Sequence, residues 1–192
     1  QQKMTDRLQH EGTELTSLRV KAGERLGKEV TKELHGLLMP TAQFSVAITP
    51  AELPGPYGFD DIALLLQPHP GSDPRPLGKG ASGGELSRIM LALEVVLANT
   101  DPVPTFIFDE IDAGVGGEAA VQIGRRLARL AKHVQVIVVT HLPQVAAYAD
   151  KHLRVNKAPN VDAGFTTSDV SELVGEDRIS ELARMLAGHA DS

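Results

Sequence analysis

Cysteine is absent from this sequence of 192 residues, which excludes a disulfide framework and a thiolate metal site. The absence agrees with a protein that functions in a reducing cytosol. Long apolar runs are absent as well. Residues 134–140 form one of the longest, and such a run is far too short to cross a bilayer. The remaining composition is that of an ordinary globular chain, long enough to bury a core.

Basic residues are outnumbered, with 19 Lys and Arg against 25 Asp and Glu, and the net charge is −6. A self-sufficient DNA-binding module usually shows the opposite balance. One basic cluster exists, made of Arg125, Arg126, Arg129, Lys132 and His133. We interpret it first as the solvated face and basic last turn of a helix, which the helix dipole favours, and only second as a nucleic-acid contact.

Residues 1–38 are predicted to form one long helix. Apolar side chains recur at steps of three, four or seven: Met4, Leu8, Leu15, Leu18, Ala22, Leu26, Val30, Leu34 and Leu37. The stripe is narrow and flanked by charge, which is typical of a coiled-coil strand and also of an amphipathic surface helix, and Pro40 ends it. We therefore expect the end of a coiled coil at 1–38 and a separate domain at 40–192. Because the chain opens within a pattern and without Met, we also expect a fragment.

The rest of the chain predicts an α/β domain with a mainly parallel sheet flanked by helices. Alternating or continuous apolar residues predict strands at 44–48 and 61–67, with Pro- and Gly-rich connections at 50–58 and 68–80. Further on, helices are expected at 83–98, 118–132, 143–149 and 176–187, and strands at 105–108, 134–140 and 152–156. The strands at 105–108 and 134–140 are apolar on both faces, as buried parallel strands are.

The first candidate site is a helix start that reads ASGGELSR over residues 81–88. Ser82 and Glu85 have the spacing of a capping box, so a well-capped helix start is one interpretation. Gly83 and Gly84 favour a second, because glycine is a poor helix former and its missing Cβ lets an anion approach the free N–H groups. A phosphate there would be held by backbone amides, the helix dipole and the Ser82 hydroxyl.

The second candidate is the pair Asp109 and Glu110, which directly follows the apolar strand at 105–108. In an open α/β sheet, ligands bind beyond the carboxyl ends of the strands. Asp109 could hold Mg²⁺, which prefers carboxylate and water, and Glu110 could deprotonate a water that attacks a phosphate. The alternative is that both acids only cap the next turn.

Two weaker candidates follow. Residues 111–117 form a glycine-rich loop with one acid, Asp112, and could close over a ligand or meet a partner surface; an ordinary connection explains them equally well. His141 follows the strand at 134–140 and could hydrogen-bond a terminal phosphate and sense its loss. A histidine at a strand end is more often only a loop hydrogen-bonder.

The order of these four elements resembles that of an ABC ATPase: signature motif, Walker B strand, D-loop and H-loop. The segments 81–93, 107–117, 139–147 and 181–188 are moreover similar to those of the RecN family of SMC-like DNA-repair ATPases. The resemblance covers about residues 40–188, with a long helix where that family has its coiled coil. The Pro-rich segment 67–77 departs from the family pattern and receives no role.

A P-loop, Gly-x-x-x-x-Gly-Lys-Ser/Thr, is missing from the sequence. The segment 23–29 is one residue short and has Glu29 in place of the hydroxyl. Lys79 is followed by glycine and lacks an upstream glycine at the right distance. In the family the P-loop lies in an N-terminal half, before the coiled coil. The resemblance therefore implies the C-terminal half of an ABC-type head that is inactive without that other half.

The resemblance also implies the ligands and the partners. ATP and Mg²⁺ are the expected cofactors, with Asp109 at the metal, Glu110 and His141 in catalysis, and Asp112 and Gly114 in the D-loop. The signature residues, Ser82, Gly83, Gly84 and Glu85, would contact ATP held by a second head. The N-terminal half, a second copy of the head and DNA are the expected partners, in the cytoplasm at the nucleoid and without a membrane.

Three alternatives stay open. The same surfaces would serve a non-catalytic dimerisation or DNA-clamping module, although such a module would be expected to lose the base Glu110, which is present. A transporter subunit would carry its P-loop upstream of the signature in one compact chain. Another SMC or Rad50-type head is the third alternative.

Overall fold

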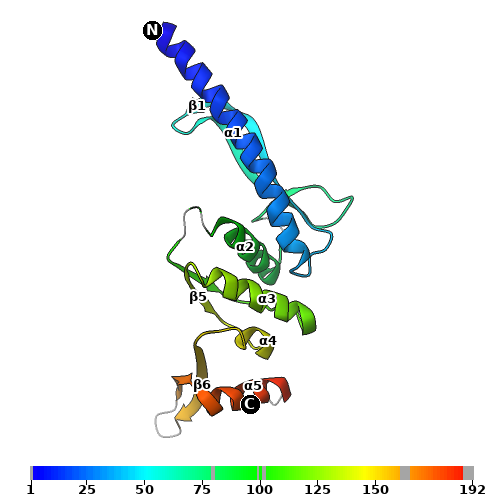
Figure 1. Ribbon diagram of the computed structural model, residues 1–192, viewed down its shortest axis with the longest axis vertical. Coiled ribbons are helices and arrows are strands. Elements are labelled where there is room, and N and C mark those ends of the chain that lie inside the picture. Colours follow the sequence, from blue (N-terminus) through cyan, green and yellow to red (C-terminus); the bar gives the residue numbers. More distant parts are fainter. Residues whose placement is uncertain (1, 79–80, 99, 101–102, 161–164, 188–192) are drawn as a thin grey trace. The chain divides into compact units, whose positions relative to one another are not determined.

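The computed structural model describes residues 2–78, 81–98, 100, 103–160 and 165–187, with the side chains of residues 157–167 left out (Figure 1). The last two residues of the predicted loop at 68–80 thus lie outside the described residues. The chain forms two compact units that divide between residues 102 and 103. The long N-terminal helix shares the first unit with the segments up to residue 102, so no division between units falls at residues 38–40. That residues 1–38 end a coiled coil and residues 40–192 form half of a head remains a prediction.

In the first unit a long helix packs along an antiparallel sheet. Helix α1 (Gln2–His35) is followed by β1 (Gln43–Gly55), β2 (Gly58–Gln67), the short β3 (Arg75–Pro76) and α2 (Gly83–Leu97). The strand order is β1-β2-β3, and α1 lies beside the hairpin of β1 and β2 (Figure 1). The predicted helix at 83–98 is confirmed, and the one at 1–38 is confirmed as far as His35, after which residues 36–38 form a turn. The predicted connection at 50–58 is wrong, because both strands continue into it and only residues 56–57 turn.

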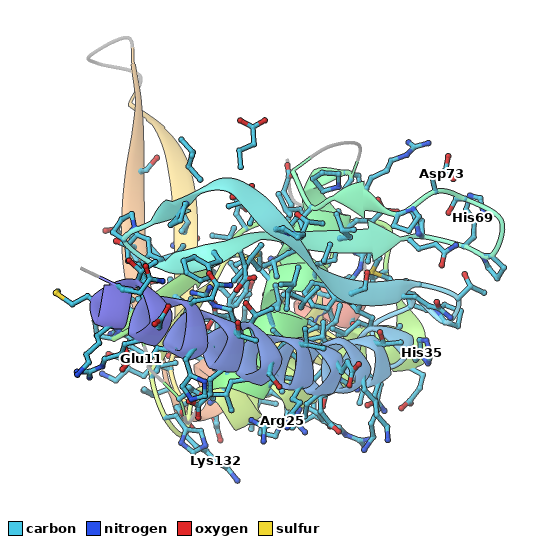
Figure 2. The ribbon with its side chains drawn as sticks, turned by 90° about the horizontal axis from the view of Figure 1, so that it is seen from above. Glu11, Arg25, His35, His69, Asp73 and Lys132 are labelled. Atoms are coloured by element: carbon cyan, nitrogen blue, oxygen red, sulfur yellow. The ribbon has the colours of Figure 1, made fainter. Side chains whose placement is uncertain are left out.

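Glycines give α1 its buried face toward the hairpin. Gly23 and Gly27 are buried, and a Cβ on Gly27 would lie 3.2 Å from the carbonyl oxygen of Phe44. A helix can approach a strand this closely only where it lacks side chains. Further along, Val30 and Leu34 continue the buried face into the core. Figure 2 shows Glu11 and Arg25, two exposed residues of the same helix, projecting from the side of α1 away from the sheet.

The leucine stripe of α1 is only partly covered. Its C-terminal members Val30, Leu34 and Leu37 are fully buried, whereas Met4 and Leu18 are 79% and 58% exposed. Apolar side chains thus run from the core into solvent along one helix. This is compatible with the predicted coiled coil.

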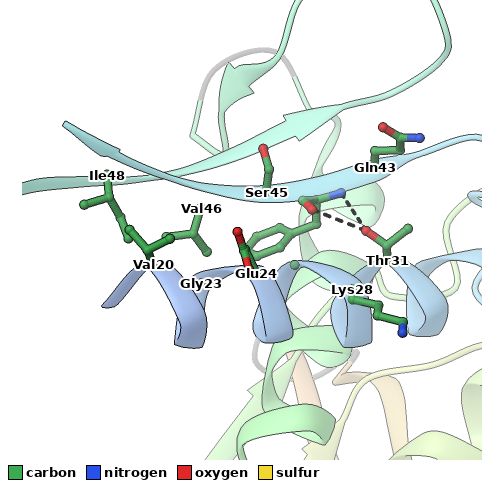
Figure 3. A pocket seen from close by; sticks show the side chains of 11 residues that line it. Val20, Gly23, Glu24, Lys28, Thr31, Gln43, Ser45, Val46 and Ile48 are labelled. Carbon is green, nitrogen blue, oxygen red and sulfur yellow. Dashed lines mark hydrogen bonds between the residues drawn. The ribbon is translucent and has the colours of Figure 1, made fainter. Parts of the chain in front are cut away.

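An open pocket of about 540 Å³ is lined by residues from the middle of α1 and from β1 (Figure 3). At its end the Thr31 hydroxyl accepts a hydrogen bond from the Phe44 N–H (3.0 Å) and donates one to the Phe44 carbonyl (3.3 Å). This hydroxyl therefore caps main-chain groups of β1, which is an edge strand of its sheet. None of the residues that line the pocket belongs to the four predicted motifs.

The second unit carries a parallel strand pair. Strand β4 (Thr105–Phe108) pairs in parallel with β5 (Gln135–Val138), with Phe108 opposite Val138. The remaining elements are α3 (Gly117–Leu130), α4 (Pro143–Ala146), an antiparallel hairpin of β6 (His152–Asn160) and β7 (Phe165–Leu173), and α5 (Gly175–Ala187). The α/β class is confirmed. In the described residues, however, parallel pairing is confined to β4 and β5, and β7 was not predicted.

The parallel pair is covered on one face only. Phe108 is buried, whereas Ile107 is 69% exposed and Val139, just after β5, is 59% exposed. Parallel strands are normally buried on both faces, whereas this pair leaves apolar side chains exposed on one face. Among the residues that the structure describes, none of the helices combines the length and the apolar character that a bilayer span requires.

Candidate functional site

The predicted capping box is confirmed at the start of α2. The Glu85 N–H donates to the Ser82 hydroxyl (3.3 Å), and the Ser82 N–H donates to the Glu85 carboxylate (3.1 Å). Ser82 and Gly83 are exposed, and Gly84 is buried. Because the Ser82 hydroxyl accepts in the cap, its own proton can still be donated to an anion. The helix start is thus both a stable cap and a surface with donors, while the Glu85 carboxylate competes there with any phosphate.

Asp109 and Glu110 follow the carboxyl end of strand β4 and are exposed to solvent there. Both side chains are exposed, and one Asp109 oxygen accepts a hydrogen bond from the Glu110 N–H at 2.9 Å. Glu110 has a φ of 57°, in the left-handed region that non-glycine residues rarely adopt. Such backbone strain clusters at sites where a side chain must be held in one place. Leu38, with a φ of 62°, shares this conformation, so the strain supports a role for Glu110 only together with its place at the carboxyl end of β4.

The strain at Glu110 leads to a stability prediction. We expect Glu110→Gly to unfold with a free energy about 1 kcal/mol higher than Glu110→Ala, because only glycine adopts a positive φ without a Cβ clash. Both variants lack the carboxylate, so its chemistry cancels in the comparison. Urea unfolding of the two variants measures the difference. Equal stability, or a more stable alanine variant, would show that the left-handed conformation at this position is unstrained.

Within residues 2–78, 81–98, 100, 103–160 and 165–187, no three His, Asp or Glu side chains lie together as metal ligands. Mg²⁺ in nucleotide sites is typically held by one or two carboxylates together with phosphates and water. An exposed carboxylate at a strand end, such as Asp109, fits that role.

Asp112 and His141 meet across 29 residues of sequence. The buried Asp112 carboxylate accepts hydrogen bonds from the Thr140 hydroxyl and, at 3.2 Å, from the His141 N–H. The same oxygen lies 3.3 Å from the His141 Nδ1. Thr140 also accepts a hydrogen bond from the Leu142 N–H at 3.0 Å. These contacts join the loop after β4 to the loop after β5.

The structure therefore brings together some of the predicted residues. Asp109, Glu110, Asp112 and His141 all follow the carboxyl ends of the neighbouring strands β4 and β5. Gly114, in the same loop as Asp112, has a φ of 69°, which explains a glycine there. The signature residues, from Ser82 to Glu85, belong to the first unit.

Two features of this surface were not predicted. Thr140 joins the Asp112 contact, and a threonine beside His141 gives no sequence signal of such a role. The left-handed backbone of Glu110 also escapes motif analysis, because the position is occupied by a residue other than glycine. Both depend on how the loops are placed by the strands.

The sequence is similar to DNA repair protein RecN of several bacteria. It is 58% identical to that of Streptomyces coelicolor over 93% of this chain, and 49% identical to that of Mycobacterium tuberculosis over the whole chain. The Deinococcus radiodurans protein is 43% identical over 93% of this chain. The chain spans about a third of the length of these relatives, namely 33%, 36% and 31%.

Solved structures of SMC heads share the fold. The Smc head domain of Pyrococcus furiosus, bound to the C-terminal domain of ScpA, matches 96% of this chain with a TM-score of 0.62 and 21% identity, over 44% of its own length. A structure described under ATP-driven dimerization and DNA-stimulated activation of SMC ATPases matches 89% of this chain and 97% of its own, with a TM-score of 0.53 and 22% identity. A family model, RecF/RecN/SMC N-terminal domain, matches residues 17–162. The chain therefore belongs to the RecF/RecN/SMC family, and it resembles the RecN proteins of that family along nearly its whole length.

Proposed function

We propose that this chain is the C-terminal half of an ATP-hydrolysing head of a DNA double-strand-break repair and recombination protein. One observation carries the proposal: Asp109 and Glu110 follow the carboxyl end of β4, and His141 follows the carboxyl end of its parallel neighbour β5. This is the edge at which α/β sheets bind ligands. The similarity to RecN proteins supports the process in which the head acts.

The proposed chemistry is attack of water on the terminal phosphate of ATP. Glu110 accepts a proton from the attacking water, and its exposed carboxylate at a constrained backbone position suits a base. His141 hydrogen-bonds the terminal phosphate. Asp109 is the carboxylate that would hold Mg²⁺, which neutralises phosphate charge when bound.

The signature residues act on a second nucleotide. Ser82 and the first-turn amides of Gly83 and Gly84 contact the terminal phosphate held by the opposite head, and Glu85 maintains the helix cap beside them. Asp112 and Gly114 belong to the loop that meets that head. The dimerisation described for SMC ATPases supports this arrangement, in which two heads enclose ATP.

The proposed partners are inferred from the missing P-loop and from the exposed apolar side chains. The P-loop that such a site requires is absent from these 192 residues, and the related proteins are about three times as long. An N-terminal P-loop half would also cover apolar side chains such as Ile107 and Val139. A second head and DNA complete the proposed partners, with the cytoplasmic nucleoid as the place of action and no membrane involved.

The test separates the chain from its proposed other half. Alone, the chain is expected to bind ATP negligibly and to hydrolyse none, because it lacks the lysine and the amides that cradle the β- and γ-phosphates. Mixing or co-expression with the N-terminal half should restore both. ATP binding by equilibrium dialysis and phosphate release are the measurements. Robust Mg²⁺-dependent turnover by the purified chain would rule out the half-site assignment.

A further inference from the structure

Asp112 is a buried carboxylate that, among the described residues, pairs with no lysine or arginine. Its side chain is only 4% exposed. Two other acids have side chains that are as well buried, and both pair with arginine: Glu181 with Arg154 and Arg184, and Asp60 with Arg19. Within the part of the chain that the structure describes, no Lys or Arg pairs with Asp112, and its partners are Thr140 and His141. A buried charge of this kind is costly, so its position calls for a reason beyond stability.

The three groups around Asp112 converge on one oxygen. The Thr140 hydroxyl and the His141 N–H both donate to Oδ2, which fixes that oxygen in place. The His141 Nδ1 lies 3.3 Å from the same atom, whereas the His141 side chain as a whole is 74% exposed. One nitrogen of an otherwise exposed ring thus lies beside a buried acceptor. An acceptor at Nδ1 sets the tautomer of a histidine, because it requires the proton on that nitrogen.

We propose that Asp112 is a positioning residue for His141 that keeps a proton on Nδ1 and leaves Nε2 to meet the terminal phosphate. The proposal rests on the function proposed above for His141. When phosphate binds, Nε2 takes up a proton from water and donates it to a phosphate oxygen, while Nδ1–H donates to Asp112. After phosphate leaves, the Nε2 proton departs to water and the proton on Nδ1 stays. Asp112 therefore acts within its own head, in addition to any contact of its loop with a second head.

The tautomer of His141 in the nucleotide-free chain tests the proposal directly. Ring ¹⁵N NMR, at a pH where the imidazole is neutral, should show a protonated Nδ1 and an unprotonated Nε2. The exposed His133 in the same unit serves as the internal reference, and His141→Gln assigns the signals. A wild-type His141 protonated at Nε2 would overturn the proposal, and this result does not depend on any variant folding.

Two substitutions of Asp112 separate positioning from packing. Asp112→Ala removes the acceptor, and the ring should shift to the Nε2–H tautomer. In Asp112→Asn, the Thr140 hydroxyl and the His141 N–H hold the amide oxygen at the same place, so the Nδ1–H tautomer should persist. If His141 keeps the Nδ1–H tautomer in a folded Asp112→Ala variant, the proposal is contradicted.

Turnover provides an independent measurement. In heads completed with the N-terminal half, Asp112→Ala should lower kcat about 10- to 100-fold with KM for ATP changed little, as loss of an orienting carboxylate does elsewhere. Asp112→Asn should fall between that variant and the wild type. Unchanged kcat in Asp112→Ala would overturn the positioning role. If His141→Gln retains full turnover while the tautomer is as expected, the role of His141 in catalysis fails and the Asp112 contact stands.

Discussion

Heads assembled from both halves should lose ATP turnover by a factor of about 10² to 10⁴ when Glu110 is replaced with Gln. The amide preserves the size and the hydrogen bonding of the side chain and removes only the base that accepts the proton of the attacking water. ATP should still bind through the P-loop and Asp109. Because hydrolysis no longer opens the dimer, ATP-bound dimers should accumulate, as measured by size-exclusion chromatography with phosphate release as the rate assay.

A matched control is available on α3. Glu118→Gln makes the same chemical change at an exposed acid that hydrogen-bonds Gln122 on its own helix. This variant should hydrolyse ATP at the wild-type rate. A Glu110→Gln head that retains wild-type turnover would remove Glu110 from the role of base and return the non-catalytic clamp as the better account of these surfaces.

Local sequence patterns predicted those elements in which the spacing of apolar residues follows the buried face. Helix α2 was predicted to within one residue, because its capping box marks the start and its apolar residues recur at helical spacing. Strand β4 was predicted to the residue, since a short apolar run bounded by Pro104 and two acids has few other interpretations. Both signals come from residues that are neighbours in the sequence, so they can be recognised without knowledge of the tertiary structure.

The interactions that the sequence did not predict depend on contacts between distant segments. Gly23 and Gly27 form part of the buried face of α1, yet a search for apolar periodicity passes over glycine. Residues 50–58, which contain the end of β1 and the start of β2, were interpreted as a connection because of Pro50 and Pro54. On an edge strand such as β1, however, a proline removes no ladder hydrogen bond that the strand needs.

The candidate site divides in the same way. Motif order placed Asp109, Glu110 and His141 near the carboxyl ends of two strands, and the structure makes those strands parallel neighbours. The contact of Asp112 with Thr140 and His141 had no sequence signal, because a spacing of 28 or 29 residues says nothing until the strands between them are paired. A pairing register fixes which loops meet, and the register is a tertiary property.

Replacing Ser82 should abolish turnover for a different reason, the failure of two heads to close. Ser82→Arg adds bulk and charge at the start of α2, and Ser82→Asp adds a negative charge while keeping a side chain that caps a helix as well as serine does. Both variants should bind ATP in each head and lose ATP-dependent dimerisation, with turnover lowered at least ~10²-fold. Because Ser82→Asp preserves the cap, its thermal stability should match that of the wild type, so a loss of closure in it cannot be attributed to an unfolded α2. Wild-type dimerisation by Ser82→Asp would argue against a phosphate at this helix start.

Mixing Ser82→Arg heads with Glu110→Gln heads then asks which nucleotide each residue serves. If the signature acts on the opposite head's ATP, the nucleotide bound to the Ser82→Arg head meets an intact Glu110 from its own head and an intact Ser82 from the other. The second nucleotide of the same mixed dimer meets both altered residues. Mixed dimers, isolated through a different affinity tag on each head, should therefore hydrolyse ATP faster than either variant alone and at no more than about half the wild-type rate, because one of two symmetry-related sites is intact. If Ser82 and Glu110 serve the same head's nucleotide, each site of the mixed dimer carries one altered residue. Mixed dimers that form in ATP but hydrolyse no faster than either variant alone would then assign both residues to one head, and the contribution of the signature in trans would have to be withdrawn.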